Sequence, residues 1–295
     1  MPEGHSIHRL ARQFTSVFAG QALAVSSPQG RFAAGAAQLD GHVLTGAQAH
    51  GKQLFLEFDN ELFLRIHLGL YGAFDFGGDD SFRGASSIGA PRRVGEQEAP
   101  DDGGGTYTGP PPPKGAVRVR LVSAHGWADL RGPTACEVIT DAERRLVLER
   151  LGPDPLGQDQ DGAEDFARRL GKRGSPVAAL LMNQEVLAGV GNVYRAEVLF
   201  RQRISPWQAG SRLRPEQARE LWNDVVAVMF DGVVQGRIVT TLAEHRSGQT
   251  EPVPVSDAHY VYKRQGLPCR ICGTEIALTE MAARKLYWCP SCQAG

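Results

Sequence analysis

The sequence has no apolar run long enough to span a membrane. VAALLM, at residues 177–182, is typical of its longest runs, whereas a spanning helix needs about 20 apolar residues. The chain also lacks the basic segment, apolar stretch and small-residue cleavage site of a signal peptide. These absences predict a cytoplasmic protein that has no membrane partner. At 295 residues, the chain is long enough for two domains with separate cores.

Net charge is also small, which by itself gives no reason to expect a nucleic-acid partner. The chain has 32 Lys and Arg against 33 Asp and Glu, a formal net charge of −1. The two halves differ, because residues 1–170 carry 17 basic and 22 acidic side chains, whereas residues 171–295 carry 15 and 11. The net charges of −5 and +4 permit an anion-binding face in the C-terminal half.

Cysteine is scarce, but its placement is informative. Of the five cysteines, Cys136 stands alone and is predicted to be a small buried residue. The others form two CxxC pairs separated by sixteen residues: Cys269, Cys272, Cys289 and Cys292. This spacing is typical of one structural zinc ion held by four thiolates. Disulfides are the weaker alternative, because a cytosolic chain is kept reduced. A closed four-thiolate site stabilises a fold and leaves no coordination position for catalysis.

The segment between the two cysteine pairs, GTEIALTEMAARKLYW, is predicted to form two short strands joined by a turn. Arg284 and Lys285 lie near that turn. A zinc-stabilised hairpin with a basic tip is suited to reaching a phosphate, although solvated surface charge explains these residues equally well.

The region before the hairpin is predicted to be helical. In SPVAALLMN, Ser175 is the expected N-cap and Pro176 the first helical residue. The glycine turn LAGVGN leads into a second helix, predicted to begin at Asn192, and free N–H groups at such a helix start bind phosphate well. Packing alone would also explain these glycines. RPEQARELWNDVVAVMF is predicted to form an amphipathic helix with Pro215 near its start.

The first half of the chain is rich in short β-type runs. ALAVSS, HVLTGAQAHG, KQLFLEF, ELFLRIHL and AVRVRLVS are separated by Gly, Asn and Asp, a pattern that indicates a β-sandwich or barrel. Residues 77–115 are rich in glycine, proline and charge, and are predicted to be a flexible insertion. From LGPDPL to about Gly174 the chain is expected to connect the two halves.

The N-terminus, MPEGHSIHRL, places a proline and a glutamate directly before a helix. Ser6 is the predicted N-cap, and apolar residues recur along one helical face. Read alone, Pro2 most simply begins a disordered tail. The alternative is that removal of Met1 frees the amine of Pro2 at a functional site.

Several segments together are similar to the formamidopyrimidine-DNA glycosylase/endonuclease VIII family. They are MPEG, AHGKQLFLEF, IHLGLYGAF, LGPDPL, LLMNQEVLAGVGNVYRAEVLF and PCRICGT…ARKLYWCPSCQ. The similarity extends over nearly the whole chain apart from the insertion. The resemblance implies an α+β protein whose N-terminal β-sandwich and first helix precede a helix–two-turns–helix domain and a C-terminal zinc finger. The predicted domains are residues 1–135 (with the 77–115 insertion), a linker at 136–174, a DNA-binding domain at 175–257 and the finger at 258–295.

The resemblance also implies roles for individual residues. The secondary amine of Pro2 would attack the sugar C1′ and form an iminium ion, an electron sink that favours elimination of the 3′-phosphate. Glu3 would be a general acid on the ring oxygen, and Lys52 would take part in proton transfer during elimination. Arg284 would grip the phosphate flanking the lesion, with Asn192 as its partner.

The expected substrate is damaged double-stranded DNA. The lesion would be flipped out of the stack, and Leu70 and Tyr71 occupy the place of the family's void-filling loop. Their LYG sequence resembles endonuclease VIII, which favours oxidised pyrimidines over oxidised purines, although Gly69 stands where that branch often has a polar residue. We expect a monomer of bacterial type, associated with the nucleoid. The alternatives are a non-catalytic DNA-binding protein of the same fold and a zinc-ribbon RNA-binding protein.

Overall fold

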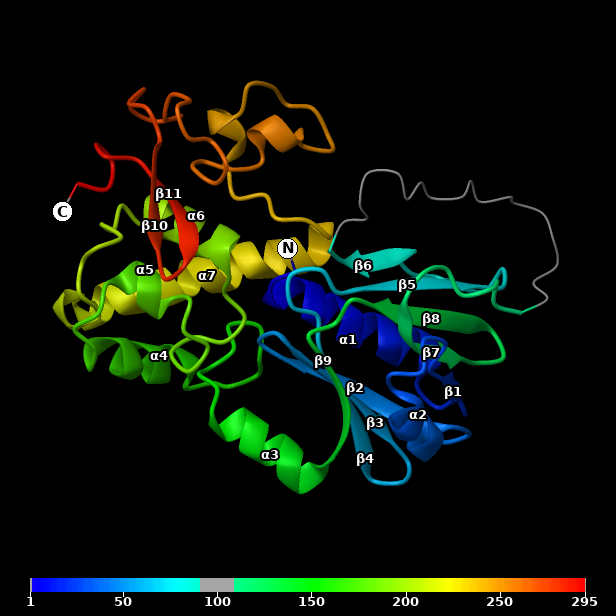
Figure 1. The fold of residues 1–295 in the computed structure, drawn as a ribbon. Coiled ribbons are helices and arrows are strands. Elements are labelled where there is room, and N and C mark those ends of the chain that lie inside the picture. The colour runs from blue at the N-terminus through cyan, green and yellow to red at the C-terminus, as the bar shows by residue number, and fades with distance from the viewer. Residues whose placement is uncertain (1, 91–108, 295) are drawn as a thin grey trace. The chain divides into compact units, whose positions relative to one another are not determined.

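A computed structural model describes residues 2–90 and 109–294. The chain divides into two units, each with its own core. Figure 1 labels the helices and strands along the chain. The first unit contains Pro2 and residues 6–148, and the second contains residues 3–5 and everything from residue 149 onward. The first helix, α1 (Gly4–Phe18), therefore begins in the second unit and continues into the first.

Two antiparallel sheets, most of α1, all of α2 (Ala33–Leu39) and most of α3 (Asp141–Glu149) build the first unit. One sheet has the strand order β1-β7-β8-β5-β6, and the other has the order β2-β3-β4-β9. In chain order the elements after α1 are β1 (Ala24–Ser26), α2 (Ala33–Leu39), β2 (Leu44–His50), β3 (Gln53–Phe58), β4 (Leu62–His67), β5 (Ala73–Gly78), β6 (Ser87–Gly89), β7 (Val117–Val122), β8 (Gly126–Arg131) and β9 (Ala135–Thr140).

The core of the first unit combines side chains from both sheets with the apolar face of α1. Phe14 on α1 contacts Phe74 and Phe76 of β5, with ring centroids 5.0 and 5.4 Å apart. Leu54 and Leu64 of the other sheet are completely buried in the same core. Because both sheets and the helix share one apolar core, this unit is the predicted β-sandwich with a first helix.

The start of α1 differs from the sequence-based expectation. The sequence predicts Ser6 as the helix cap, but the helix begins two residues earlier, at Gly4, and Ser6 is buried inside it. The Gly4 N–H donates to the carbonyl oxygen of Gly189 at 2.8 Å. A long-range hydrogen bond therefore satisfies a donor that a local cap would otherwise serve.

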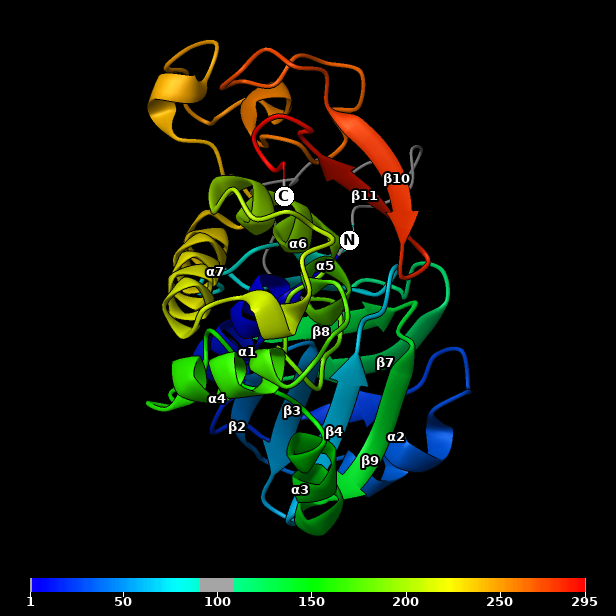
Figure 2. The same ribbon diagram turned by 90° about the vertical axis from the view of Figure 1, so that its left-hand side faces the viewer.

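The second unit is mainly helical and ends in a hairpin. Its elements are α4 (Gly162–Gly171), α5 (Val177–Leu180), α6 (Asn192–Arg201), α7 (Pro215–Gln235), β10 (Ala277–Met281) and β11 (Arg284–Trp288), and α3 (Asp141–Glu149) joins the two units. Three short 3₁₀ turns occur at residues 210–212, 243–245 and 255–257. β10 and β11 pair in antiparallel register, as Figure 2 shows.

The predicted helix starts in this unit are confirmed at two places and wrong at a third. α6 begins at Asn192, and α7 begins at Pro215 and ends at Gly236, whose φ of 75° is a left-handed cap. The segment after Ser175, by contrast, forms a helix of only four residues with Pro176 as its N-cap. Residues 181–191, between this short helix and α6, form turns and irregular structure.

Two segments that the sequence predicts to be irregular contain regular structure where they are described. Of the predicted insertion, residues 91–108 lie outside the described residues, and the described part holds the end of β5 and all of β6. The predicted connection at 136–174 holds most of β9 together with α3 and α4. No helix among the described residues has the length and apolar character needed to cross a membrane.

Candidate active site and zinc centre

The carboxylate of Glu3 is bound at the N-terminus of α6. Oε2 accepts a hydrogen bond from the Gly191 N–H at 2.8 Å, and Oε1 accepts one from the Val193 N–H at 2.8 Å. A third N–H, from Tyr194, lies 3.4 Å from Oε2. Glu3 is 0% exposed. Free N–H groups and the helix dipole make a helix start a favourable place for a buried negative charge.

The glycines of the LAGVGN turn leave the space that this contact needs. A Cβ at position 191 would lie 2.5 Å from Cδ of Glu3, closer than real Cβ contacts allow. Gly189 has a φ of +91°, and its carbonyl oxygen accepts the N–H of Gly4. The LAGVGN turn therefore contacts both the Glu3 side chain and the Gly4 backbone. These glycines thus have a role beyond helix packing.

Two aromatic rings lie beside this carboxylate. His5 and Tyr194 meet edge to face, with centroids 5.5 Å apart, and both are buried. Burial raises the pKa of the Tyr194 phenol well above its usual value, and the negative charges of Glu3 and Asp231 add to that effect. Tyr194 therefore stays neutral at physiological pH.

Lys52 lies in the first unit, in a two-residue turn between β2 and β3. His50 and Gln53 pair across that turn, and Gly51 supplies its positive φ of 56°. The sequence placed Lys52 at the start of the strand, and the strand begins one residue later. A tight turn fixes the lysine backbone while its long side chain remains half-buried.

The proposed void-filling residues are exposed, as that role requires. Leu70 is 37% and Tyr71 75% exposed. They follow Gly69, whose φ of +66° and closeness to Thr134 leave no room for a side chain: a Cβ there would lie 1.8 Å from the Thr134 hydroxyl. The glycine that departs from the endonuclease VIII pattern is thus demanded by its surroundings.

His67 is a residue that the sequence reasoning missed. It lies on β4 directly across from Gln53, next to the Lys52 turn, and its Nδ1 accepts the Gly69 N–H at 3.2 Å. Burial lowers its pKa, and the positive charges of Lys52 and Arg65 lower it further. His67 therefore connects the Lys52 turn to the exposed loop. The sequence feature that could have indicated His67 is its position in IHLGLYG, two residues before Gly69 and the exposed loop.

In the second unit, Arg284 is the first residue of β11 and is exposed at the tip of the hairpin. Asn192 is only 6% exposed, and its Nδ2 donates to the carbonyl oxygen of Lys285 at 2.9 Å. The structure thus brings Glu3, Asn192 and the arginine-bearing strand together around the start of α6. Pro2 directly precedes Glu3 in the chain, whereas Lys52, Leu70 and Tyr71 belong to the first unit.

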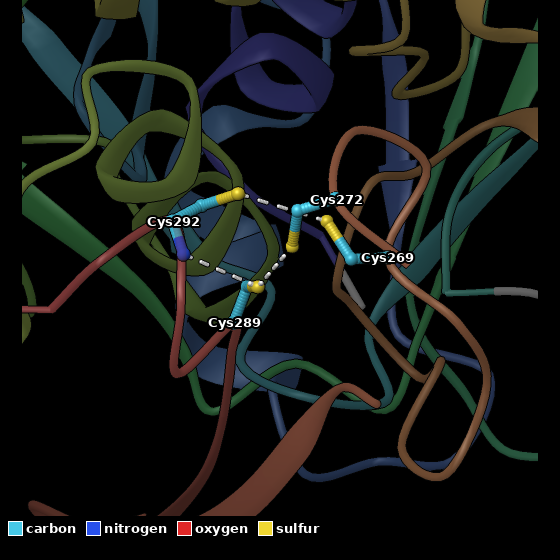
Figure 3. A group of neighbouring side chains, drawn as sticks. All are labelled: Cys269, Cys272, Cys289 and Cys292. Atoms are coloured by element: carbon cyan, nitrogen blue, oxygen red, sulfur yellow. Dashed lines mark hydrogen bonds between the residues drawn. The ribbon is translucent and has the colours of Figure 1, made fainter. Parts of the chain in front are cut away.

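The four paired cysteines converge, as Figure 3 shows. Their Sγ atoms all lie within 4.8 Å of one another, with 3.9 Å between Cys269 and Cys292 and 3.5 Å between Cys272 and Cys289. A tetrahedral zinc ion with Zn–S bonds of about 2.3 Å sets its sulfurs about 3.8 Å apart. The donor set and its spacing therefore fit one structural zinc ion.

Cys136, the cysteine outside the two CxxC pairs, has no part in the zinc site. Cys136 lies in β9, half-buried against the core, and burial raises the pKa of its thiol to about 12. Such a thiol stays protonated and unreactive, consistent with a packing role.

Comparison with known families accounts for most of the chain. Residues 1–128 match the formamidopyrimidine-DNA glycosylase N-terminal domain, and residues 151–243 match the H2TH domain of the same glycosylase. Residues 266–295 match the zinc finger found in FPG and IleRS. The three matches follow one another in the order that the resemblance predicts.

Individual proteins agree with these family matches. Endonuclease 8 1 of Mycobacterium tuberculosis is 43% identical over 293 residues, covering 99% of this chain and all of the relative. Formamidopyrimidine-DNA glycosylase of an Acidovorax species is 32% identical over 99% of both chains. The crystal structure of the MutM (Fpg) protein from Thermus thermophilus has a TM-score of 0.73 at 26% identity, covering 99% of this chain and 98% of the other. The chain therefore belongs to the formamidopyrimidine-DNA glycosylase/endonuclease VIII family and is a DNA-repair glycosylase and abasic-site lyase.

Proposed function

We propose that this enzyme removes oxidised pyrimidines from double-stranded DNA by way of the N-terminal amine of Pro2. The observation that carries the proposal is the contact between Glu3 and the start of α6, because it holds the residue next to Pro2 on the helical domain. Solved structures of Lactococcus lactis Fpg contain damaged or abasic DNA, and at 20–22% identity they share this fold. The preference for pyrimidines rests on the LYG loop.

The reaction begins with removal of Met1, which gives Pro2 a nitrogen with a free electron pair. That nitrogen forms a bond to C1′ as the bond between C1′ and the base breaks, and the base departs with the electron pair and a proton. The C1′–O4′ bond then breaks as the nitrogen electron pair forms a double bond to C1′, and O4′ takes up a proton, which yields an iminium ion at the proline nitrogen. Leu70 and Tyr71 fill the gap that the flipped nucleotide leaves in the stack.

Elimination follows because the iminium ion draws electrons from C2′. As a proton leaves C2′, the C3′–O bond breaks and the 3′-phosphate departs with the electron pair. A second elimination releases the 5′-phosphate, and water then hydrolyses the iminium ion to free the proline. We assign proton transfer in these steps to Lys52, whose turn fixes its backbone beside β3.

The hydrogen bonds to Glu3 support a second role for its carboxylate, beside the general acid that the resemblance implies. Each of its oxygens accepts a backbone N–H, and hydrogen bonds of this kind stabilise the negative charge of a carboxylate. We propose that Glu3 acts as a carboxylate that stabilises positive charge as it develops on the neighbouring proline nitrogen and the sugar. Its fixed position means that little reorganisation is needed when that charge appears.

Arg284 and Asn192 bind the phosphate that flanks the lesion. The exposed guanidinium of Arg284 can donate two parallel hydrogen bonds to phosphate oxygens. One N–H of the Asn192 amide is used on Lys285, and we assign the other to the phosphate. The zinc ion held by the four cysteines stabilises the finger that presents Arg284.

We also propose that the enzyme acts as a monomer at the bacterial nucleoid. One chain carries the amine, the lysine, the void-filling loop and the finger, so a second copy is not needed to complete the site. Light scattering at micromolar concentration should give the mass of one chain, 31.9 kDa, and a mass of twice that value would contradict the proposal.

The lesion preference is tested with two duplexes that differ only at one position, an oxidised thymine in one and 8-oxoguanine in the other. Single-turnover base release should be faster on the oxidised thymine, and an undamaged duplex should remain uncut. Faster release of 8-oxoguanine would overturn the pyrimidine assignment while leaving the lyase chemistry intact.

A further inference from the structure

Arg195 is a completely buried arginine on α6 whose guanidinium reaches the finger hairpin. Nη1 donates to the carbonyl oxygen of Met281 at 3.2 Å, and Nη2 donates to that of Lys285 at 3.3 Å. Nη2 also donates to the side-chain oxygen of Asn192, and Ala178 O lies 3.5 Å from Nη1. An arginine fixed at 0% exposure needs such acceptors, because burying its charge is otherwise costly.

The two hairpin acceptors lie on either side of the tip that carries Arg284. Met281 is the last residue of β10 and pairs with Arg284, the first residue of β11. Lys285 follows Arg284 directly, and its carbonyl oxygen accepts from both Arg195 and Asn192. The guanidinium of Arg195 thus joins both strands at the point from which Arg284 projects.

The turn at the tip has an unfavourable backbone for its residues. Its two turn residues, Ala282 and Ala283, both have a φ of 54°, a left-handed conformation that glycine or asparagine adopts more readily than alanine. Contacts from outside the hairpin help to offset this local cost. The guanidinium of Arg195, held in turn by α6, provides such contacts.

The charges are consistent with this arrangement. Burial lowers the pKa of Arg195 to about 10, the negative charge of Glu3 opposes that shift, and the positive charge of Arg284 adds to it. Arg195 consequently remains cationic at neutral pH. It places a second positive charge near the exposed arginine, which strengthens the attraction for an anion at the tip.

We propose that Arg195 is a positioning residue that fixes Arg284 for its contact with the DNA phosphate. The inference rests on the proposed phosphate-binding role of Arg284. Arg195 itself is buried and touches no substrate, so it acts by holding the hairpin tip and by adding to its positive potential. Through Asn192 and α6, the same contacts connect the tip to the helix start that binds Glu3.

The test is a double-mutant cycle on a duplex with a single abasic site, which needs no base recognition. Arg195→Met removes the guanidinium and its N–H donors but keeps a long side chain. Arg284→Ala removes the exposed guanidinium. Each should lower the single-turnover rate of strand cleavage by roughly 10- to 100-fold. Arg284→Ala should also flatten the slope of log affinity against log salt by about one unit, because it removes one phosphate contact. Arg195→Met should flatten it in the same direction, because Arg284 is then no longer held against the phosphate. The double variant should be little worse than either single one.

Gln293→Ala is the matched control for general loosening of the finger. Gln293 is also buried and also joins the finger to the helical domain, donating to the carbonyl oxygen of Ile204 at 3.1 Å, but it lies beyond the far end of β11. It should keep the wild-type salt slope. Arg195→Lys, which keeps the charge but lacks the forked guanidinium, provides a milder variant if Arg195→Met does not fold. It should slow cleavage and flatten the salt slope in the same direction as Arg195→Met, because without the fork Arg284 is not held in place.

The outcomes separate the two proposals. If Arg284→Ala alone leaves cleavage and salt slope unchanged, the phosphate role of Arg284 fails and the inference fails with it. If Arg284→Ala has its expected effect but Arg195→Met behaves like Gln293→Ala, the positioning role alone is overturned. Losses that multiply in the double variant would also overturn it, because independent effects add in free energy.

Discussion

Replacing Gly191 with alanine tests the contact on which the site is built. The backbone at this position is extended (φ −124°, ψ −158°), so alanine meets no conformational barrier there. The new Cβ, however, would lie 2.5 Å from Cδ and 2.7 Å from Oε1 of Glu3. Because the α6 backbone is packed in the core, the carboxylate is the group that must move.

The cost follows from the hydrogen bonds that are lost. Glu3 accepts two N–H groups at 2.8 Å, and a hydrogen bond to a charged group contributes about 1.5–3 kcal/mol of net stability. Losing both would cost about 3–6 kcal/mol, and a displaced carboxylate that reaches water recovers part of this. We therefore expect the Gly191→Ala variant to lose about 2–4 kcal/mol of unfolding free energy.

Activity should fall more steeply than stability, because a carboxylate displaced by an ångström no longer lies where charge develops. We expect base release to slow by about 100-fold at a temperature where the variant is still folded. Urea unfolding and single-turnover base release are the two assays. Gly171→Ala is the matched control: Gly171 ends α4, a Cβ there meets nothing within 4 Å, and alanine should be neutral or stabilising. If Gly191→Ala matches this control in both assays, Glu3 is not bound as described.

Three further changes have definite expected results. Glu3→Gln should lower the free energy of unfolding by about 1–3 kcal/mol, because the amide NH₂ would face a backbone N–H donor. The control Glu185→Gln, at an exposed position, should change it little in the same urea assay. Equal stability of the two variants would contradict the binding of Glu3 at the start of α6. Stability should fall below pH 6.5 as His67 takes up a proton. The pKa of His67 in the folded chain is lower than the unfolded value of 6.5. The stability that neutral His67 contributes is therefore complete above pH 6.5 and is lost as pH falls through the folded pKa. The protonated ring can no longer accept the Gly69 N–H, and His67→Gln should flatten this part of the stability–pH curve; an unchanged curve would rule out the assignment. Cys289→Ala should abolish binding of one zinc equivalent, measured by elemental analysis, and weaken DNA binding while the first unit stays folded; full activity without zinc would show that the four thiolates are not a structural site.

The zinc site and the longer helices could be predicted because their signals are local. The spacing of the four cysteines specifies a donor set, and the amphipathic pattern after Pro215 specifies α7, which runs to Gln235. The start of α1 could not be predicted in the same way. A serine that looks like an N-cap lies inside the helix, since the Gly189 carbonyl, far along the chain, accepts the first N–H.

The arrangement of the site depends on contacts that sequence spacing does not reveal. Glu3 and Val193 are 190 residues apart, and nothing in MPEG indicates that its carboxylate would be bound at a helix start. Arg195 was overlooked because arginine usually lies on a surface. Its place in the apolar run NVYRAEVLF, where most side chains are buried, was the available signal.

The most direct test of the account is to identify the atom that attacks the sugar. The enzyme, processed to begin at Pro2, is incubated with a duplex carrying one abasic site in the presence of borohydride, which reduces the iminium ion to a stable bond. Proteolysis and mass spectrometry then locate the DNA-linked peptide. The account predicts a single adduct on the N-terminal peptide at Pro2, and none from protein that wholly retains Met1. An adduct on Lys52 or any other lysine, or full trapping by protein that retains Met1, would contradict it.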